Sequence, residues 1–353
     1  MAVFLPLDFP YHQIVTLSLP SATVKILSNM NSPCDLTREQ RLIQTVKELT
    51  RSEYIGDDCA VLGAGQLLSS DMLVEDKHFR LAYADLESIG WKCIAVNLSD
   101  IAAMGGFPTA LLVSIAWPEH RSDAQFRQLY SGIHECARKF STRIVGGDIT
   151  SSEKIVCAVT IIGQAAKPAA LLRSTAALGH IVAVTGDFGA SACGLESLLK
   201  GRRELTYPVS RHLRPQPRIG AGLTLSQILA RRNGTQKVAM MDTSDGLADA
   251  ALQVAKASGV GIEIDAELVP IHAQTLASAK ELGLDPLSLA LYGGEDFELF
   301  ACMSEDLWSE VKNSDQDNQF KMIGRVVAGA GAELISNGRR CALDNSRTYQ
   351  HFA

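Results

Sequence analysis

Apolar residues along the chain follow two spacings, one typical of β-strands and the other typical of α-helices. Short apolar runs next to Gly, Ser or Asp predict strands in the first half at Ala60–Leu62, Gln66–Ser69, Leu111–Ala116, Thr142–Val145 and Ile155–Ile162. Apolar positions three or four residues apart predict helices at Leu42–Leu49, Asp85–Met104 and Ser122–Phe140. Asp85 is a residue type that caps helices, and Gly105-Gly106 ends the second of them.

The second half of the chain repeats this mixed pattern. It predicts a helix ending at Leu199, a helix at Leu247–Ser258, and strands at Ile181–Thr185, Val238–Met241 and Gly261–Ile264. Because strands and helices alternate throughout, the expected fold class is α/β or α+β. A chain of 353 residues exceeds the size of one typical core, so we expect an N-terminal domain at 37–165 and a C-terminal domain at 166–353.

Residues 1–36 contain four prolines and no sustained periodicity. We expect a flexible N-terminal extension here. Two origins fit this segment equally well: a real extension, or an upstream misassignment in which Met30 is the true start.

Composition narrows the possible partners. Apolar residues make up 46% of the chain and charged residues 20%, which is ordinary usage for a folded protein. The net charge is −6 and there is no long basic run, which excludes nucleic acid as an expected partner. The longest apolar stretches have the length of a strand, and eight scattered cysteines form no Cys-x-x-Cys pair. We therefore expect no membrane segment and a cytoplasmic location.

Six acidic segments recur in one form, with an apolar stretch followed by Gly or Ser and then by Asp or Glu. They are read as loops or helix ends at Gly56–Asp58, Ser69–Asp71, Asn97–Asp100, Gly146–Asp148, Met241–Gly246 and Gly293–Asp296. A turn or a helix cap explains any single one, because turns favour these residue types. Asp100 lies among apolar neighbours, where an unpaired carboxylate is costly to bury. The set as a whole therefore indicates bound metal ions.

Carboxylates that hold several Mg²⁺ ions are suited to phosphoryl transfer, since this reaction needs alignment and charge neutralisation more than covalent help. When the acceptor is itself a phosphate, its oxygen is already anionic and no general base is needed. The chain has no G-x-x-x-x-G-K-[ST] loop, no kinase His-Arg-Asp loop and no strand followed by G-x-G-x-x-G. ATP must therefore be bound in another way. Gly186–Ala190, just before a helix, would place amide groups near phosphate, although a tight strand-to-helix turn explains this segment better.

The order of these segments resembles that of the thiamine-monophosphate kinases, which share a superfamily with aminoimidazole ribonucleotide synthetase and selenophosphate synthetase. The match runs from about Leu42 to the end, and its most specific parts are Trp91–Gly105, His212–Pro215, Asp242–Leu247 and Gly293–Leu299. The resemblance implies a two-domain aminoimidazole ribonucleotide synthetase-like fold, with a mixed sheet and helices in the N-terminal domain and a C-terminal α/β domain. It also implies a homodimer formed through the N-terminal sheet.

The resemblance further implies direct transfer of the ATP γ-phosphoryl group to thiamine monophosphate, giving thiamine diphosphate and ADP. ATP is then the co-substrate and several Mg²⁺ ions are the cofactors. The implied metal ligands are Asp58, Ser69, Ser70, Asp71, Asp100, Asp148, Asp242 and Asp245. Among these, the implied catalytic carboxylates are Asp71, Asp148 and Asp242. The implied ATP contacts are Tyr130, Gly147, Asp148, Arg173 and Ser244, and the implied thiamine monophosphate contacts are His78, Glu295 and Tyr349.

The chain departs from the family pattern at three places. Arg38–Gln40 replaces the usual Gly-Glu-Phe, Asp76-Lys77 replaces Gly and a small residue, and Ile149 replaces Thr. Only Asp76-Lys77 lies near the implied substrate loop, so it bears on substrate affinity and not on the reaction class.

Two other functions remain open from the sequence. One is a superfamily member with a different acceptor. A selenophosphate synthetase would want a reactive Cys or selenocysteine near a Lys in a Gly-rich segment, and Cys34 has no such setting. The other is a non-catalytic sensor of nucleotide or thiamine phosphate. A sensor would usually lack one or more of the metal carboxylates, and all of them are present here.

Overall fold

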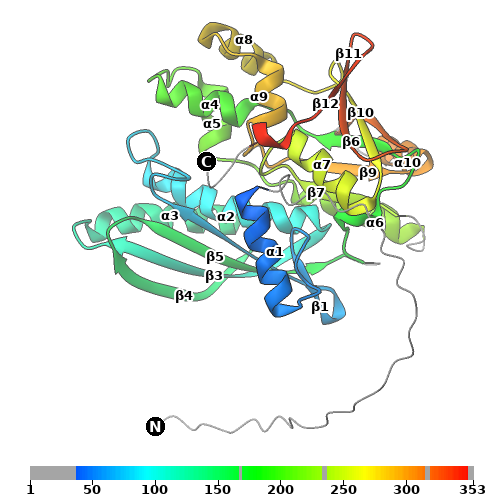
Figure 1. Cartoon of the computed structure of the whole chain (residues 1–353). Helices are drawn as coiled ribbons and strands as arrows, with labels where there is room; N and C mark the ends of the chain where they lie inside the picture. The colour runs from blue at the N-terminus through cyan, green and yellow to red at the C-terminus, as the bar shows by residue number, and fades with distance from the viewer. Residues whose placement is uncertain (1–36, 167–168, 233–236, 315–318, 349–353) are drawn as a thin grey trace, which may run out of the picture.

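Two β-sheets, each with its own helices, make up the part of the chain that the computed structural model describes, namely residues 37–166, 169–232, 237–314 and 319–348 (Figure 1). The extension expected at residues 1–36 lies outside these ranges. Within these ranges, no helix is both long enough and apolar enough to cross a lipid bilayer.

The first sheet is built from residues in the N-terminal half and has the strand order β1-β2-β5-β3-β4. Its strands are β1 (Ala60–Leu62), β2 (Gln66–Val74), β3 (Gly106–Pro118), β4 (Arg143–Ser152) and β5 (Val156–Ala165). Neighbouring strands run antiparallel except β3 and β4, which are parallel. Helices α2 (Leu86–Ala103) and α3 (Asp123–Lys139) lie on one side of this sheet (Figure 1). The opposite side of the sheet carries no helix in this view.

The second sheet has seven strands in the order β12-β11-β8-β10-β6-β9-β7. Its strands are β6 (Ile181–Thr185), β7 (Ala239–Asp242), β8 (Gly261–Asp265), β9 (Leu299–Met303), β10 (Phe320–Val327), β11 (Gly331–Ser336) and β12 (Arg339–Ala342). The helices of this half are α4 (Ala190–Leu199), α5 (Thr206–Leu213), α6 (Ile219–Arg231), α7 (Leu247–Ser258), α8 (Ala273–Leu282), α9 (Pro286–Tyr292) and α10 (Glu305–Ser314). The sheet is mixed, because β8 and β11 are parallel while the other pairs are antiparallel.

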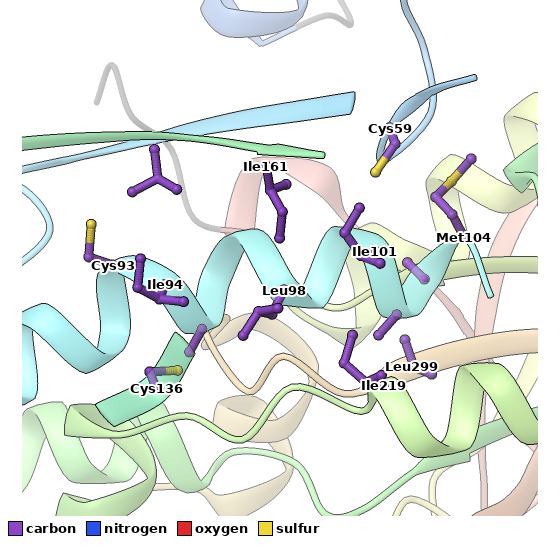
Figure 2. Packing of buried hydrophobic residues seen from close by; sticks show 14 of the residues in the cluster. Cys59, Cys93, Ile94, Leu98, Ile101, Met104, Cys136, Ile161, Ile219 and Leu299 are labelled. Atoms are coloured by element: carbon purple, nitrogen blue, oxygen red, sulfur yellow. The ribbon is translucent and has the colours of Figure 1, made fainter. Parts of the chain in front are cut away.

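Helix α2 is the structural centre of the molecule. Asp85 caps its N-terminus by accepting a hydrogen bond from the Ser88 amide at 2.7 Å. All of its residues except Glu87 and Asp100 are buried. The helix has the first sheet on one side and residues of the second half on the other, as Ile161, Ile219 and Leu299 show around it in Figure 2. A single apolar core therefore joins the two halves through α2.

Helix α1 (Arg38–Thr50) is the least embedded helix that the structure describes. Thr37 caps it, and the capping box with Gln40 is complete. It has no buried residue, and Leu42, Val46 and Leu49 are exposed. Its helical form thus owes more to capping and local propensity than to packing.

The α/β (α+β) fold class and the two-domain arrangement of mixed sheets with helices are confirmed. The domain limits at 37–165 and 166–353 stay a prediction. Two of the expected acidic loops are wrong, since Ser69–Asp71 lies inside β2 and Gly146–Asp148 lies inside β4. Pairing with neighbouring strands overrides the turn preference of these residues.

Candidate active site

Three carboxylates from distant parts of the chain converge beside the C-terminal end of α2. Asp58 precedes β1, Asp100 lies in the last turn of α2, and Asp242 is the last residue of β7. One oxygen from each lies within 4.8 Å of the others. Asp58 and Asp242 are buried and Asp100 is half-buried. The two halves of the molecule thus contribute to one acidic centre.

Hydroxyl and amide groups hold these carboxylates in place. The hydroxyl of Ser69 donates to Asp100, and Ser99 Oγ donates to Asp242 Oδ2 at 2.6 Å. The amide of Asp71 donates to Asn97 Oδ1 at 3.2 Å, which ties β2 to α2. Ser99 and Asn97 lie on the same helix as Asp100, so α2 orients groups from both sheets.

Burial and repulsion between the carboxylates raise the pKa values of Asp100 and Asp242. Burial raises the pKa of Asp100 well above its usual range, and the charges of Asp71, Asp242 and Asp58 raise it further. Burial and the charge of Asp58 raise the pKa of Asp242 to about 7. Buried like charges at this separation call for a cation between them.

Arg173 supplies positive charge at one edge of the acidic centre. Its guanidinium lies 2.5 Å from Asp58 Oδ1, and its amide donates to Asp57 Oδ2 at 3.1 Å. Gln253 of α7 accepts a further hydrogen bond from Arg173 at 2.6 Å. Burial and the charge of Asp58 raise the pKa of Asp57 to about 6, although Arg173 counteracts them. Arg173 is thus in contact with a predicted metal ligand.

Asp245 lies in the turn between β7 and α7. Burial, and then the charges of Asp249, Glu39 and Asp242, raise the pKa of Asp245 to about 8. Asp249 is a buried carboxylate of α7 that the sequence analysis missed. The one available signal was its place in the first turn of the helix that follows Asp245.

The register of the first sheet separates the remaining predicted metal ligands. Asp71 pairs with Val159, which is buried on the α2 side. Asp148 belongs to the neighbouring row, with Ser114, Ala158 and Met72, and this row faces away from α2. Ser70 faces the same way and donates to the Val159 carbonyl at 3.0 Å.

The structure therefore brings Asp58, Ser69, Asp71, Asp100 and Asp242 to one place, and it places Ser70 and Asp148 on the other face of the sheet. Gly147 has a structural explanation of its own, because a Cβ there would lie 1.7 Å from the Val113 carbonyl oxygen. Their roles as metal or ATP ligands stay predictions.

The predicted substrate residue Glu295 contacts α2 through Lys92, two helical turns before the Ser99 that contacts Asp242. Glu295 Oε1 is 2.7 Å from Lys92 Nζ, and Glu295 Oε2 is 3.4 Å from His212 Nδ1. His78 Nδ1 accepts a hydrogen bond from the Val74 amide at 3.0 Å. A small cleft lies beside these contacts. It is lined by His78, Phe79, Tyr83, Ala84, Ser88, Ile89, Lys92, His212 and Leu213. The third predicted substrate contact, Tyr349, lies outside the described residues.

A second, larger cleft opens beside Arg173. Its volume is about 460 Å³, and it is lined by Lys47, Glu53, Tyr54, Ile55, Gly56, Asp57, Cys59, Val61, Ala169, Ala170, Leu172, Arg173, Ser174 and Ala257. Of the other predicted ATP contacts, Tyr130 packs on Phe126 with ring centroids 5.7 Å apart. Ser244 accepts a hydrogen bond from the Glu295 amide at 2.6 Å, which connects the ATP and substrate predictions.

Asp76 stands where the family commonly has glycine, and it keeps the backbone conformation of that turn. Asp76 adopts a positive φ of 68°, a conformation that glycine adopts more readily. Its carboxylate forms an exposed ion pair with Lys154 at 2.9 Å. The turn that precedes His78 is therefore kept although the usual glycine is missing.

Comparison with known proteins identifies the family. Residues 56–165 match the model for the AIR synthase related protein N-terminal domain, and residues 179–337 match the model for its C-terminal domain. The thiamine-monophosphate kinase of Bacillus subtilis is 39% identical over 269 residues, which cover 73% of this chain and 79% of that protein. The corresponding enzyme of Synechococcus elongatus is 38% identical over 89% of this chain and 96% of its own. The chain belongs to the thiamine-monophosphate kinase family.

Solved structures of this family agree with the fold. The structure of AaThiL complexed with AMPPCP and TMP has a TM-score of 0.79 and 32% identity, and the match covers 92% of this chain and 100% of that one. The thiamine monophosphate kinase of Aquifex aeolicus has a TM-score of 0.77 and 31% identity, with 88% and 100% covered. The family expected from the acidic segments is thereby confirmed, as is its two-domain fold.

Proposed function

We propose that this member of the thiamine-monophosphate kinase family transfers the γ-phosphoryl group of ATP directly to thiamine monophosphate beside the cluster of Asp58, Asp100 and Asp242. Family membership carries the ATP-dependent phosphorylation of thiamine monophosphate to this chain. The observation that carries the proposed location is the convergence of three carboxylates from both halves within 4.8 Å. The related AaThiL structure holds AMPPCP and TMP together, which supports binding of both substrates in one site.

The donor set fits Mg²⁺. Asp58, Asp100 and Asp242 offer oxygen atoms alone, and hard divalent cations prefer such ligands. The raised pKa of Asp242, near 7, reflects repulsion and burial that a cation would relieve. Asp71 and Asp245 lie close enough to influence these carboxylates electrostatically. We propose that these five residues hold several ions, which would neutralise the charge on the phosphates of both substrates.

The chain's own residues align the substrates and exclude water. Ser69 and Ser99 donate to Asp100 and Asp242, so these carboxylates are already oriented before any ligand binds. The acceptor oxygen of thiamine monophosphate is anionic, so no side chain has to remove a proton from it. In the balanced reaction the bond between the γ-phosphorus and the β–γ bridging oxygen breaks, and a bond from the acceptor oxygen to that phosphorus forms.

ATP would approach from the Arg173 side and thiamine monophosphate from the Glu295 side. Arg173 borders the larger cleft and carries a guanidinium suited to phosphate oxygens. His78 lines the small cleft, and Glu295 contacts Lys92 and His212, which line it too. A carboxylate and an imidazole suit the cationic, hydrogen-bonding ring system of thiamine. Asp148 lies on the face of the first sheet that points away from α2. It would contribute to metal binding only if another surface covers that face.

A homodimer is part of this proposal. The face of the first sheet that points away from α2 exposes Met72, Phe107 and Leu112, whose exposed fractions are 55%, 44% and 41%. Large apolar side chains gathered on one sheet face usually mark an interface. A second copy of the chain would bury them symmetrically. We also propose a cytoplasmic location, in keeping with the seven unpaired cysteines of the described residues.

The decisive test is release of ADP by the purified full-length chain with ATP and Mg²⁺, in parallel with thiamine monophosphate, free thiamine or no acceptor. Chromatography should find thiamine diphosphate only with thiamine monophosphate. Free thiamine should fail because it leaves the ions without phosphate ligands. Turnover with neither thiamine compound, despite tight ATP binding, would contradict the proposal and favour the sensor.

A further inference from the structure

Lys92 is a buried, positively charged side chain that has no role in the proposed reaction. It lies on α2 with 4% of its surface exposed, and its ammonium group borders the small cleft. Its ion-pair partner is Glu295, at 2.7 Å. Within the described ranges Nζ has no acceptor besides Glu295, so two of its donors remain available. A buried ammonium is costly unless its charge serves a purpose.

The backbone around Glu295 is held in an unusual conformation. Glu295 and Phe297 have positive φ angles of 58° and 51°, which non-glycine residues adopt rarely. Asp296 accepts hydrogen bonds from the amides of Gly189 and Ser191 at 2.7 and 3.0 Å. The turn is thus fixed from α4, and it holds the Glu295 carboxylate against Lys92 and His212, two residues that line the cleft.

Lys92 is the cation that balances Glu295 at neutral pH. His212 also contacts the carboxylate, but burial and the nearby Lys92 lower the pKa of His212 to about 3. Its imidazole is therefore neutral. Burial would raise the pKa of Glu295, yet the Lys92 charge more than offsets this and holds it below the usual range.

We propose that Lys92 is a positioning residue for thiamine monophosphate, which acts by holding the Glu295 carboxylate ionised and oriented at the substrate cleft. Lys92 and Asp100 lie on the same helix, eight residues and about 12 Å apart. Since α2 carries both, the distance between the substrate contact and the metal centre is fixed by one rigid element. This inference rests on the proposed function.

The test compares Lys92→Met with the wild-type chain by steady-state kinetics. Methionine keeps the length and apolar stem of lysine but removes its charge. The KM for thiamine monophosphate should rise by about tenfold or more, while the KM for ATP should change by less than about twofold. Lys321→Met is the matched control, because Lys321 pairs with Asp187 at 2.9 Å on the surface of the second sheet. This control should keep both KM values.

A double variant keeps the test decisive if Lys92→Met folds poorly. Replacing a buried ion pair by two neutral side chains is often tolerated when loss of one partner is not. Glu295→Gln and Lys92→Met/Glu295→Gln should therefore share the same KM for thiamine monophosphate, because Lys92 acts only through Glu295. A further rise in the double variant would overturn the proposal.

The pH dependence of KM distinguishes positioning from general packing. The titratable groups that face Glu295 are Lys92 of α2, His212 of α5, and His78 and Tyr83 of the segment between β2 and α2. Without Lys92 the carboxyl should take up a proton more readily, so KM for thiamine monophosphate in Lys92→Met should rise as pH falls from about 8 to 6. The wild type and Glu295→Gln should lack this additional rise, since any pH dependence from the metal-site carboxylates is common to all three chains.

The outcomes separate the two proposals. A wild-type chain that does not phosphorylate thiamine monophosphate contradicts the proposed function. A wild-type chain that does, together with a Lys92→Met variant that keeps its KM or loses affinity equally for both substrates, contradicts the positioning role alone.

Discussion

Crowded carboxylates should make the stability of the metal-free protein fall as pH rises. The pKa of Asp242 is raised to about 7 and that of Asp245 to about 8, whereas both would titrate near 4 in the unfolded chain. The folded state therefore binds more protons than the unfolded state between these values, and the free energy of unfolding decreases as pH increases. Thermal unfolding in EDTA should show a melting temperature several degrees lower at about pH 8 than at about pH 6.

Mg²⁺ should reverse this trend, since it binds the ionised carboxylates and displaces their protons. The rise in melting temperature on adding Mg²⁺ should be larger at about pH 8 than at about pH 6. Asp242→Asn removes one of the repelling charges, so it should flatten the pH dependence in EDTA. A melting temperature of the metal-free protein that rises with pH across this range would contradict the electrostatic account.

Asp71→Asn should remove activity and leave the fold intact. The side chain lies on the α2 side of β2, where its charge acts on Asp100 and Asp242. We expect kcat to fall by about 10²-fold or more, because a charged group beside the transferred phosphoryl would be lost. Circular dichroism and thermal unfolding should match the wild type. Asp306→Asn, an exposed carboxylate of α10, is the control and should keep normal kcat.

Some residues of the acidic centre were predictable from their position beside apolar stretches of the sequence. Asp58 precedes an apolar stretch, Asp100 interrupts one and Asp242 follows one, and these three converge. Ser70 and Asp148 share the same local pattern but face away from α2, because the face of a strand residue depends on register. Lys92 gave no signal, since one lysine in an apolar helix does not reveal which distant carboxylate it meets.

At the scale of elements, the contact between α2 and α3 depends on two glycines. A Cβ on Gly132 of α3 would lie 1.8 Å from the Glu87 carbonyl oxygen, and a Cβ on Gly90 of α2 would lie 2.0 Å from the Leu129 carbonyl oxygen. Gly132→Ala should therefore force the helices apart and destabilise the protein by about 3 kcal/mol or more. Urea unfolding measures this directly.

Gly220→Ala is the matched control for this substitution. Gly220 also lies in a helix, α6, but nothing lies within 4 Å of the position of an added Cβ. Alanine favours helix over glycine, so this variant should be as stable as the wild type or more stable by up to about 1 kcal/mol. Equal effects of the two substitutions would show that helix propensity, and not close packing, governs both sites.

Elements with a clear local signal were predicted well. The helix at Leu247–Ser258 and the strand at Ile181–Thr185 have the bounds expected from the sequence. The strands β2 and β4 were cut short at Ser69 and Val145, because polar and glycine residues inside a strand resemble turns. Their extension depends on pairing with β5 and β3, which lie far away in the sequence.

At the scale of the whole molecule, α2 joins the two halves into one core. Local patterns predict this helix, but they do not show what covers each of its sides. The structure places β5 on one side and α6 and β9 on the other, as Ile161, Ile219 and Leu299 illustrate (Figure 2). The acidic centre exists only because this shared core aligns Asp100 with carboxylates from both halves.

A second copy of the chain should cover the open face of the first sheet, and Met72→Lys should prevent it. Met72 of β2 lies on this face and is 55% exposed. A buried lysine at a symmetric interface would appear twice, at a cost of several kcal/mol without a partner charge. Sedimentation equilibrium should find a dimer for the wild type and a monomer for Met72→Lys.

Leu199→Lys tests whether any exposed apolar position would give this result. Leu199 ends α4 in the second half, and 50% of its surface is exposed, close to the value for Met72. This variant should remain a dimer. Because Asp148 lies in the same row as Met72, loss of the dimer should also weaken any contribution of Asp148 to ATP binding. A monomeric Met72→Lys chain with unchanged KM for ATP would place Asp148 outside the nucleotide site, whereas a raised KM would tie that site to the dimer interface.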